Sequence, residues 1–502
     1  MRGVEIVLLL VVLATAVAAS ARWLRVPAPS LLVVAGLLVA FIPGVPTIEL
    51  APDLVSLVVL PPLLYAAGQD LPWRELKPVW RPVTVLAIGL VVASAAAVGA
   101  VAVAVTPLPA SLALVLGAVL ASTDPVAVTA LGRRLALPAR LQALIQAESL
   151  FNDATSLVLV RVAVSAAIAG GAVSLGRGTA QFALLAGGGV LVGAVVAGGV
   201  ALIRLRTEDP VLETVTSLVT PYVAFVVAES LHVSGVTAVV VASVILASLA
   251  TRLTNAQIRL QVHAVYDTVV FLLESVVFSL IGLQLPALVR GQPVSWLWQA
   301  AAVLATLLAV RALWVFPLSL AMGGRRSWRV PVVVSWAGAR GVLPLAAALS
   351  VPLSLGPGRQ HVLLLTTAVV IATLVVQGFT LGPLVRRSGV ALPAEHARTE
   401  EAAARLAMCQ AALNHLDEVE GVNAAPKVVV AQLRQFLQSR VKDADSAPET
   451  AVEPVMQQLR RDLIAVEEAE LTRLYEDGVI GAGTRSRLQR QLDLEQSSLD
   501  DS

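Results

Sequence analysis

The sequence predicts an all-α polytopic membrane protein with about thirteen transmembrane helices and a helical, polar C-terminal tail. Three observations support this fold class. The 502-residue chain is 57% hydrophobic and only 14% charged, whereas a soluble domain of average composition has roughly 25% charged residues. Apolar stretches long enough to cross a bilayer recur from Val4 to about Val385. From Leu392 onward the composition changes abruptly to Glu, Asp, Arg and Gln.

This change divides the chain into a membrane domain, residues 1–390, and a tail, residues 391–502. We expect each apolar segment of the membrane domain to be one spanning helix. The first segment, with Arg2 before an apolar run and small residues after it, also fits a cleavable signal peptide, and that alternative stays open. The expected segments are 4–19, 30–42, 50–67, 83–105, 111–131, 141–168, 180–203, 212–231, 234–250, 263–285, 295–320, 331–352 and 361–385.

The positions of Lys and Arg between the segments support this count and give an orientation. Alternate connections are rich in basic residues, and the connections between them are poor. Because cytoplasmic connections are enriched in Lys and Arg, we expect the N-terminus outside and the tail in the cytoplasm. The rich set is Arg22, Arg25, Arg74, Lys77, Arg81, Arg133, Arg134, Arg140, Arg204, Arg206, Arg252, Arg259, Arg325, Arg326, Arg329, Arg386 and Arg387, and the poor set is Arg2, Arg177, Arg290 and Arg359.

Two segments are expected to be interrupted near the middle of the membrane. Segment 111–131 contains Ser122-Thr123-Asp124-Pro125, and segment 331–352 contains Gly338-Ala339-Arg340-Gly341 followed by Pro344. Proline lacks a backbone N–H and clashes with the preceding helical turn. The two segments run in opposite directions, and paired interrupted helices in two inverted halves mark the binding site of a transporter. Ordinary proline kinks are the alternative.

A run of acidic and amide residues follows in the sixth segment, Glu148-Ser149-Leu150-Phe151-Asn152-Asp153. A carboxylate at the centre of a membrane helix costs about 2.5–3.5 kcal/mol, so Asp124, Glu148 and Asp153 must face the protein interior, water or partners. Ser149 and Asp153 are four residues apart and share one helix face. We therefore expect Asp153 to lie among oxygen atoms from Ser149 and Asn152, opposite Asp124 and the carbonyl group of Thr123.

These oxygen atoms suit a hard monovalent cation such as Na⁺. Two close carboxylates in a low-dielectric site also favour retention of a proton. A site that binds either Na⁺ or H⁺, but not both, meets the minimal physical requirement for exchanging the two ions. The alternative is that the acids only hold helices together.

Other charged residues in the apolar segments are expected to have partners. Arg340 cannot lose its proton in a protein, and we expect it to form a structural ion pair with Glu148. Glu274, in segment 263–285, is equally compatible with ion binding and with packing. Glu229 is expected at the outer entrance or in a structural role, and Arg161 is expected to reach outward.

These motifs, together with Val233-Ser234-Gly235 after Glu229, resemble those of the monovalent cation:proton antiporters, which include bacterial NhaP-type sodium/proton antiporters and animal sodium/hydrogen exchangers. The resemblance covers about residues 5–390. It implies a homodimer in which each chain has two inverted six-helix repeats, a dimerisation part and a moving core. It further implies that Asp153 binds the ion with help from Thr123, Asp124, Ser149 and Asn152. The Asn152-Asp153 pair is typical of the branch thought to exchange one cation for one proton without net charge movement.

One position departs from the family pattern. Many relatives have a Glu just after Leu-Pro-Pro-Leu-Leu, whereas here Leu60–Leu64 is followed by Tyr65-Ala66-Ala67. This difference puts the cation affinity and the pH profile in doubt.

The tail contains apolar residues at helical spacing, which predicts an amphipathic helix that packs on another tail helix. A regulatory or ligand-binding role is the alternative. The apolar residues are Met456, Leu459, Leu463, Val466, Leu471 and Leu474.

The sequence thus favours a secondary antiporter in the cell membrane, not an enzyme, that exchanges cytoplasmic Na⁺ for external H⁺ by alternating access. A monovalent cation channel is an alternative, but a channel needs weak sites in series. An intramembrane hydrolase could use Asp124 and Asp153, although it leaves Asn152 and Arg340 without a role. The ligand types do not separate Na⁺ from Li⁺ or K⁺, so K⁺/H⁺ antiport stays open.

The remaining expectations concern partners. The lipid bilayer, Na⁺ and H⁺ are expected partners, and nucleic acid is not. No structural metal is expected, because the five histidines lack metal-ligand spacing and the single Cys409 excludes a cysteine cluster. No cofactor is expected either.

Overall fold

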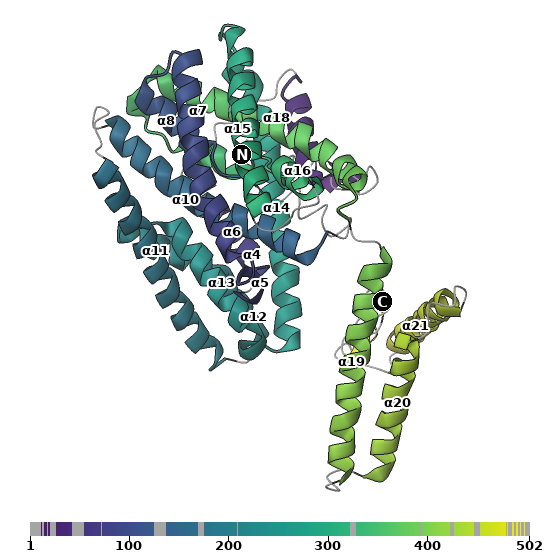
Figure 1. Cartoon of the computed structure of the whole chain (residues 1–502). Coiled ribbons are helices and arrows are strands. Elements are labelled where there is room, and N and C mark those ends of the chain that lie inside the picture. The colour runs from purple at the N-terminus through teal and green to yellow at the C-terminus, as the bar shows by residue number, and fades with distance from the viewer. Residues whose placement is uncertain are drawn as a thin grey trace. The chain divides into compact units, whose positions relative to one another are not determined.

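The computed structural model describes residues 27–42, 55–124 except 72, 137–168, 175–321 except 208, 328–391, 394–421, 426–445 and 452–477, with scattered residues near both ends. All regular structure in these ranges is helical, as the sequence predicts. The chain divides into two units, Met1–Leu392 and Pro393–Ser502, which are described separately. Figure 1 shows the helices of both.

Within its described residues, the first unit has seven continuous helical stretches that are long and apolar enough to cross a membrane. They are α6 (Trp80–Thr84), η2 (Val85–Leu90) and α7 (Val91–Val105) as one stretch, then α10 (Ala139–Ile168), α11 (Leu175–Arg204), α12 (Pro210–Ser230), α14 (Ala256–Val289), α15 (Ser295–Ala321) and α18 (Pro357–Ser388). Shorter elements lie between them: α2 (Ala28–Val39), η1 (Val55–Val59) with α4 (Leu60–Gln69), α5 (Trp73–Leu76), α8 (Ala110–Val119), α13 (Gly235–Leu253), α16 (Arg329–Trp336), α17 (Val342–Leu349) and η3 (Leu353–Leu355).

The apolar segments predicted these helices well. Each expected segment from 30–42 onward contains a described helix, whereas segment 4–19 lies outside the described residues apart from scattered positions. Among the segments that were expected to be uninterrupted, the bounds differ most for α14, which covers Ala256–Val289 where 263–285 was expected. The side chain of Asn255 accepts a hydrogen bond from the backbone N–H of Ile258 at 2.9 Å. This N-cap starts the helix before its apolar part.

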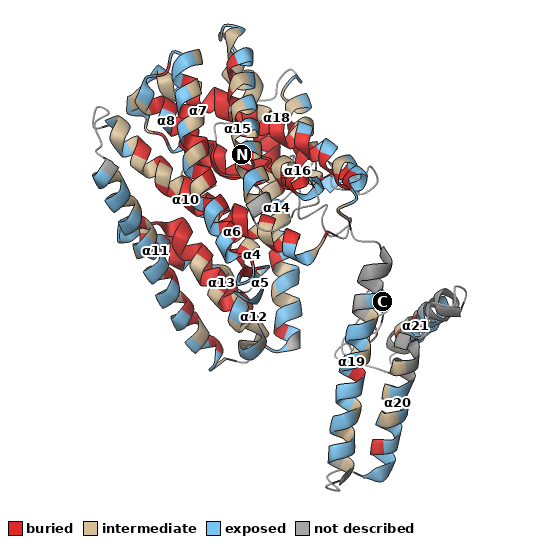
Figure 2. Ribbon diagram, in the orientation of Figure 1, coloured by how far each residue is buried: buried red, intermediate tan, exposed pale blue. Residues whose placement is uncertain are grey.

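Two groups of helices are distinguished in the first unit, and α2, α14, α16, α17 and α18 are not included in either of them. Helices α4, α11, α12 and α13 pack on one another, and so do α7, α8, α10 and α15. Helix α10 also contacts α11 and α13, and we call this line of contact the seam. In Figure 1, α10 lies between the α7–α8 pair and α11. Figure 2 shows buried residues concentrated inside the unit and many exposed residues along α11, as expected for a helix that faces lipid.

The second unit contains α19 (Ala394–Gly421), α20 (Lys427–Asp445) and α21 (Val452–Glu476). Helices α19 and α20 pack on each other, and Arg434 bridges them through Asp417 and Glu420. The predicted helix around 456–474 corresponds to α21. Its buried side agrees only in part with the one expected: Leu471 is buried as expected, but Leu463 and Val466 are exposed and Ile464 is buried instead.

Candidate ion-binding site

The first predicted interruption follows α8, which ends at Val119. Residues 122–124 are not helical, and residues 125–136 lie outside the described part of the chain. Pro125 follows Asp124, and the residue before a proline is disfavoured in the helical conformation. Near the end of α8, the hydroxyl of Ser156 on α10 donates a hydrogen bond to the carbonyl of Ala118 at 2.7 Å. Because the helix ends here, the backbone N–H and C=O groups of residues 122–124 are available for hydrogen bonds to other elements.

The second interruption separates α16 from α17, and it crosses the first. Residues Ala337–Gly341 are not helical, and Pro344 lies in the first turn of α17, where a proline is tolerated. The backbone N–H of Asp124 donates to the carbonyl of Ala339 at 2.7 Å. The structure therefore confirms that the two interruptions cross and that the second one separates two half-helices, while the continuation of the first, residues 125–136, lies outside the described residues.

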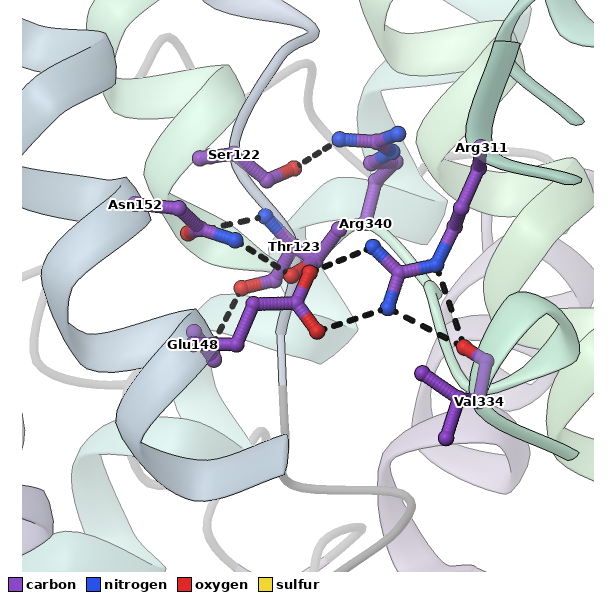
Figure 3. Close-up of polar contacts among 8 residues, drawn as sticks. Ser122, Thr123, Glu148, Asn152, Arg311, Val334 and Arg340 are labelled. Atoms are coloured by element: carbon purple, nitrogen blue, oxygen red, sulfur yellow. Dashed lines mark hydrogen bonds and ion pairs between the residues drawn. The ribbon is translucent and has the colours of Figure 1, made fainter. Parts of the chain in front are cut away.

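Helix α10 is joined to the first interruption by hydrogen bonds at Thr123 (Figure 3). The side-chain Nδ2 of Asn152 donates to Thr123 Oγ1 at 2.6 Å, and the backbone N–H of Thr123 donates to Asn152 Oδ1 at 3.3 Å. The hydroxyl of Ser149 donates to the Thr123 carbonyl. These bonds satisfy backbone groups that a continuous helix would have satisfied itself. They also occupy both polar atoms of the Asn152 amide.

Asp153 lies at the edge of a cavity of about 300 Å³. The residue is 9% exposed, and among the described residues its Oδ1 atom has no hydrogen-bond partner. Such atoms are uncommon in folded proteins and call for an explanation. Thr123, Asp124 and Ser149 line the same cavity. The structure thus brings together four of the five expected ion-binding residues, whereas Asn152 does not line the cavity.

The cavity extends along α4 and α14, and its lining includes Asp70, which directly follows α4, and Asp267 of α14. Tyr65, at the first position after the Leu-Pro-Pro-Leu-Leu sequence, stacks on Tyr266 of α14 with ring centres 5.7 Å apart. Glu274 of α14 also lines the cavity. Residues Tyr65–Ala67 of α4 contain no acid where many relatives have a Glu. In this structure, Glu274 of α14 is an acid that lines the same cavity.

The predicted Glu148–Arg340 ion pair is wrong. Glu148 instead pairs with Arg311 of α15, with Nη1–Oε1 at 2.5 Å and Nη2–Oε2 at 2.9 Å. Arg311 also donates to the carbonyl of Val334 on α16, from Nε at 3.2 Å and from Nη2 at 3.1 Å. Figure 3 shows Arg311 between Glu148 and Val334. Arg340 donates from Nη1 to the carbonyl of Ser122, so it stabilises the first interruption.

Arg311 was not predicted as a site residue, although the sequence contains a signal for it. It is an Arg in the apolar segment 295–320, and intramembrane arginines nearly always have partners. The side chain has space because residue 338 is glycine: a Cβ atom there would lie 2.7 Å from Arg311 Nε. The resulting bidentate pair connects α10, α15 and α16 behind the ion site.

Glu229 has structural contacts near the far end of α10. Its Oε1 atom accepts hydrogen bonds from Arg161 Nη2 and from the backbone N–H of Gly235. Arg161 Nη1 also donates to the carbonyl of Val233 at 3.4 Å. The pair therefore joins α10 to the connection between α12 and α13. Unlike the Glu148–Arg311 pair, it is partly exposed.

A Gly341→Ala variant is expected to exchange ions at least about tenfold more slowly than the wild type while remaining folded. A Cβ atom at this position would lie 1.5 Å from Asp124 Oδ2, so Asp124 must move away from the site. The exchange rate in proteoliposomes and the thermal unfolding midpoint measure the two effects. A Gly187→Ala variant is the control, because a Cβ atom there meets nothing within 4 Å. Equal exchange rates for all three proteins would contradict the role given to the Asp124–Gly341 contact.

Comparisons with known proteins extend these observations. A family model described as the sodium/hydrogen exchanger, transmembrane, matches residues 7–387. A protein of Mycobacterium bovis named as an uncharacterized Na⁺/H⁺ exchanger is 33% identical over 95% of this chain and 92% of its own. The Na⁺/H⁺ antiporter ApNhaP of Aphanothece halophytica is 34% identical over 79% of this chain and 76% of its own.

A solved structure supports the fold. The sodium proton antiporter MjNhaP1 from Methanocaldococcus jannaschii matches with a TM-score of 0.65 at 21% identity, over 77% of this chain and 98% of that chain. At this identity, the match is informative about the fold alone.

Proposed function

The chain belongs to the sodium/hydrogen exchanger family, and from this premise we propose that it exchanges cytoplasmic Na⁺ for external H⁺, with Asp153 as the carboxylate that holds either ion. Membership of this family means that the chain is a multi-pass membrane protein and that its activity is cation:proton antiport. The cation, the stoichiometry, the carrier residue and the orientation in the membrane belong to the proposal.

The observation that supports Asp153 most directly is its buried Oδ1 atom at the cavity. Na⁺ requires oxygen ligands, and we propose that Asp153, Asp124, Ser149 and Thr123 supply them. The Thr123 carbonyl accepts a hydrogen bond from Ser149, and a carbonyl oxygen has a second lone pair to offer. We assign Asn152 the role of holding Thr123 in place. A proton on Asp153 would remove the negative charge that Na⁺ needs, so the two ions compete.

The other buried charges near Asp153 support an electroneutral exchange of one Na⁺ for one H⁺. Arg340 stays protonated in both ion-bound states. Glu148 is neutralised by Arg311 throughout. One carboxylate that gives up one proton to bind one Na⁺ leaves the charge of the moving part unchanged.

The shape of the cavity supports alternating access with the site open to the cytoplasm. Its lining reaches Asp70 and Asp267, on elements next to the connections that hold Arg74 and Arg252. The excess of basic residues assigns those connections to the cytoplasm. The two helix groups of the first unit support a division into a dimerisation part and an ion-carrying core in a homodimer.

Purified protein in proteoliposomes with a trapped pH dye and an imposed pH gradient tests the proposal. Added Na⁺ is expected to collapse the gradient, and clamping the membrane potential at zero is expected to leave the rate unchanged. Li⁺ and K⁺, added in turn, give the ion preference. A response to K⁺ alone would replace the proposal with K⁺/H⁺ antiport, and a Na⁺ current without proton movement would indicate a channel.

A further inference from the structure

An apolar groove lies along the seam, and the α10 residues that line it differ from those that line the cavity of the ion site. It has a volume of about 360 Å³, and its walls come from α5 with α6 and η2, from α10, from α11 and from α13. Apart from Thr84, Thr155 and Thr237, its lining residues are apolar. Phe151 and Ala154 form part of the α10 wall, and these two residues flank Asn152 and Asp153 in the sequence.

The groove is open to the outside of the protein. Trp73, Trp80, Ile88 and Val190, from two of its walls, are between 45% and 55% exposed. Since the chain spans a membrane, an apolar opening of this kind faces lipid and not water. The pale and tan residues along α11 in Figure 2 belong to the same lipid-facing side.

Basic side chains surround one end of the groove. Arg74, Lys77 and Arg81 are exposed, and none of them forms an ion pair with another described residue. The Arg81 guanidinium lies 5.6 Å from the centre of the Trp80 ring. Lys77, Trp80 and Arg81 share an adjoining hollow of about 410 Å³. Tryptophans near basic residues are typical of the membrane–water interface, where lipid phosphates lie.

The length of the groove corresponds to one lipid chain. At the basic end, the backbone N–H of Trp73 donates to Ser248 Oγ of α13 at 2.8 Å. Thr237 of the same helix lines the groove further along. At 1.5 Å per residue, the distance between these two levels of α13 is about 16 Å, which is most of the length of an extended acyl chain.

We propose that this groove binds one acyl chain of an anionic phospholipid whose phosphate group pairs with Arg74, Lys77 and Arg81. The positive charge at one end of the groove suits the phosphate group of such a lipid, and the apolar groove of matching length suits its acyl chain. The bound chain contacts both helix groups across the seam and supports α10 beside the ion site. The lipid is therefore a structural ligand that stabilises the protein in the membrane.

Native mass spectrometry of the full chain in detergent, with added phosphatidylglycerol or phosphatidylcholine, tests this inference. The wild type is expected to retain phosphatidylglycerol preferentially. An R74Q/K77Q/R81Q variant is expected to bind it roughly a hundredfold more weakly, since each charge near an anionic lipid contributes roughly fivefold. The matched control is R252Q/R386Q/R387Q, which removes three exposed basic residues elsewhere and is expected to bind phosphatidylglycerol like the wild type.

An Ala186→Phe variant tests the groove independently of charge, because it fills the α11 wall and leaves the basic residues intact. It is expected to lose the bound phosphatidylglycerol while keeping its elution profile and helix content. Equal retention of the two lipids by the wild type would overturn the phosphate contact. Wild-type retention of phosphatidylglycerol by both the charge variant and Ala186→Phe would overturn the site altogether.

Discussion

An Asp153→Asn variant is expected to lose Na⁺/H⁺ exchange by at least about a hundredfold in rate, because its carboxamide has no proton to exchange. The replacement has nearly the same shape as the carboxylate. It also removes a charge from a nearly buried position, so folding is expected to be retained. Dye-loaded proteoliposomes measure the rate, and the thermal unfolding midpoint in detergent measures the folding.

The matched control for this variant is Asp267→Asn. Asp267 lines the same cavity on α14 but is not part of the crossing of the two interrupted helices. Its loss is expected to reduce the rate by less than about tenfold, through a weaker attraction of cations into the cavity. Wild-type exchange by Asp153→Asn would refute the proposed carrier. Na⁺ conduction without proton movement in that variant would favour a channel.

Replacement of Arg311 by Met is expected to destabilise the protein by about 3–5 kcal/mol, because it leaves the charge of Glu148 buried without a partner. The carbonyl of Val334 also loses both of its Arg311 donors. Arg311 and Glu148 are 2% and 1% exposed, so water cannot take the place of either. The free energy of unfolding in detergent measures the effect.

Two further variants distinguish a lost pair from a lost side chain. Glu148→Met combined with Arg311→Met is expected to recover much of the stability, since removing both partners of a buried pair is often nearly neutral. Arg161→Met breaks the partly exposed pair with Glu229 and is expected to cost less than about 1 kcal/mol. If Arg311→Met and Arg161→Met were equally stable, the connecting role of the buried pair would be refuted.

The crossing of the interrupted helices could be predicted because its causes are local. Pro125 disfavours helix at Asp124, and the glycines at 338 and 341 allow the second interruption to pass close to its neighbours. The acids could be predicted because a carboxylate in a membrane segment needs a polar environment wherever it lies. Neither inference needs the position of another helix.

The partner of Glu148 could not be predicted in this way. Arg340 and Arg311 both lie in apolar segments, and the choice depends on which side of α10 faces α15, a contact between residues 163 positions apart. The hydrogen bonds between Asn152 and Thr123 were not predicted, for a related reason. Helical spacing placed Asn152 near Asp153, but the freed N–H of Thr123 needed a partner, and Asn152 supplies it. Both outcomes depend on how the helices pack and on which backbone groups need a hydrogen-bond partner. The spacing of residues in the sequence gives no information on either.

The hydrogen bonds at the crossing join Asp124 to Ala339, and Thr123 to Ser149 and Asn152. Away from water, opening any of them would leave a polar group unsatisfied at a cost of several kcal/mol. In the proposed cycle they therefore stay closed, and the ion ligands travel as one rigid body. The ion then has the same ligands, and the same binding preference, whichever side of the membrane it faces. The exchanger is therefore expected to be reversible, with the ion gradients alone setting the direction of net flow.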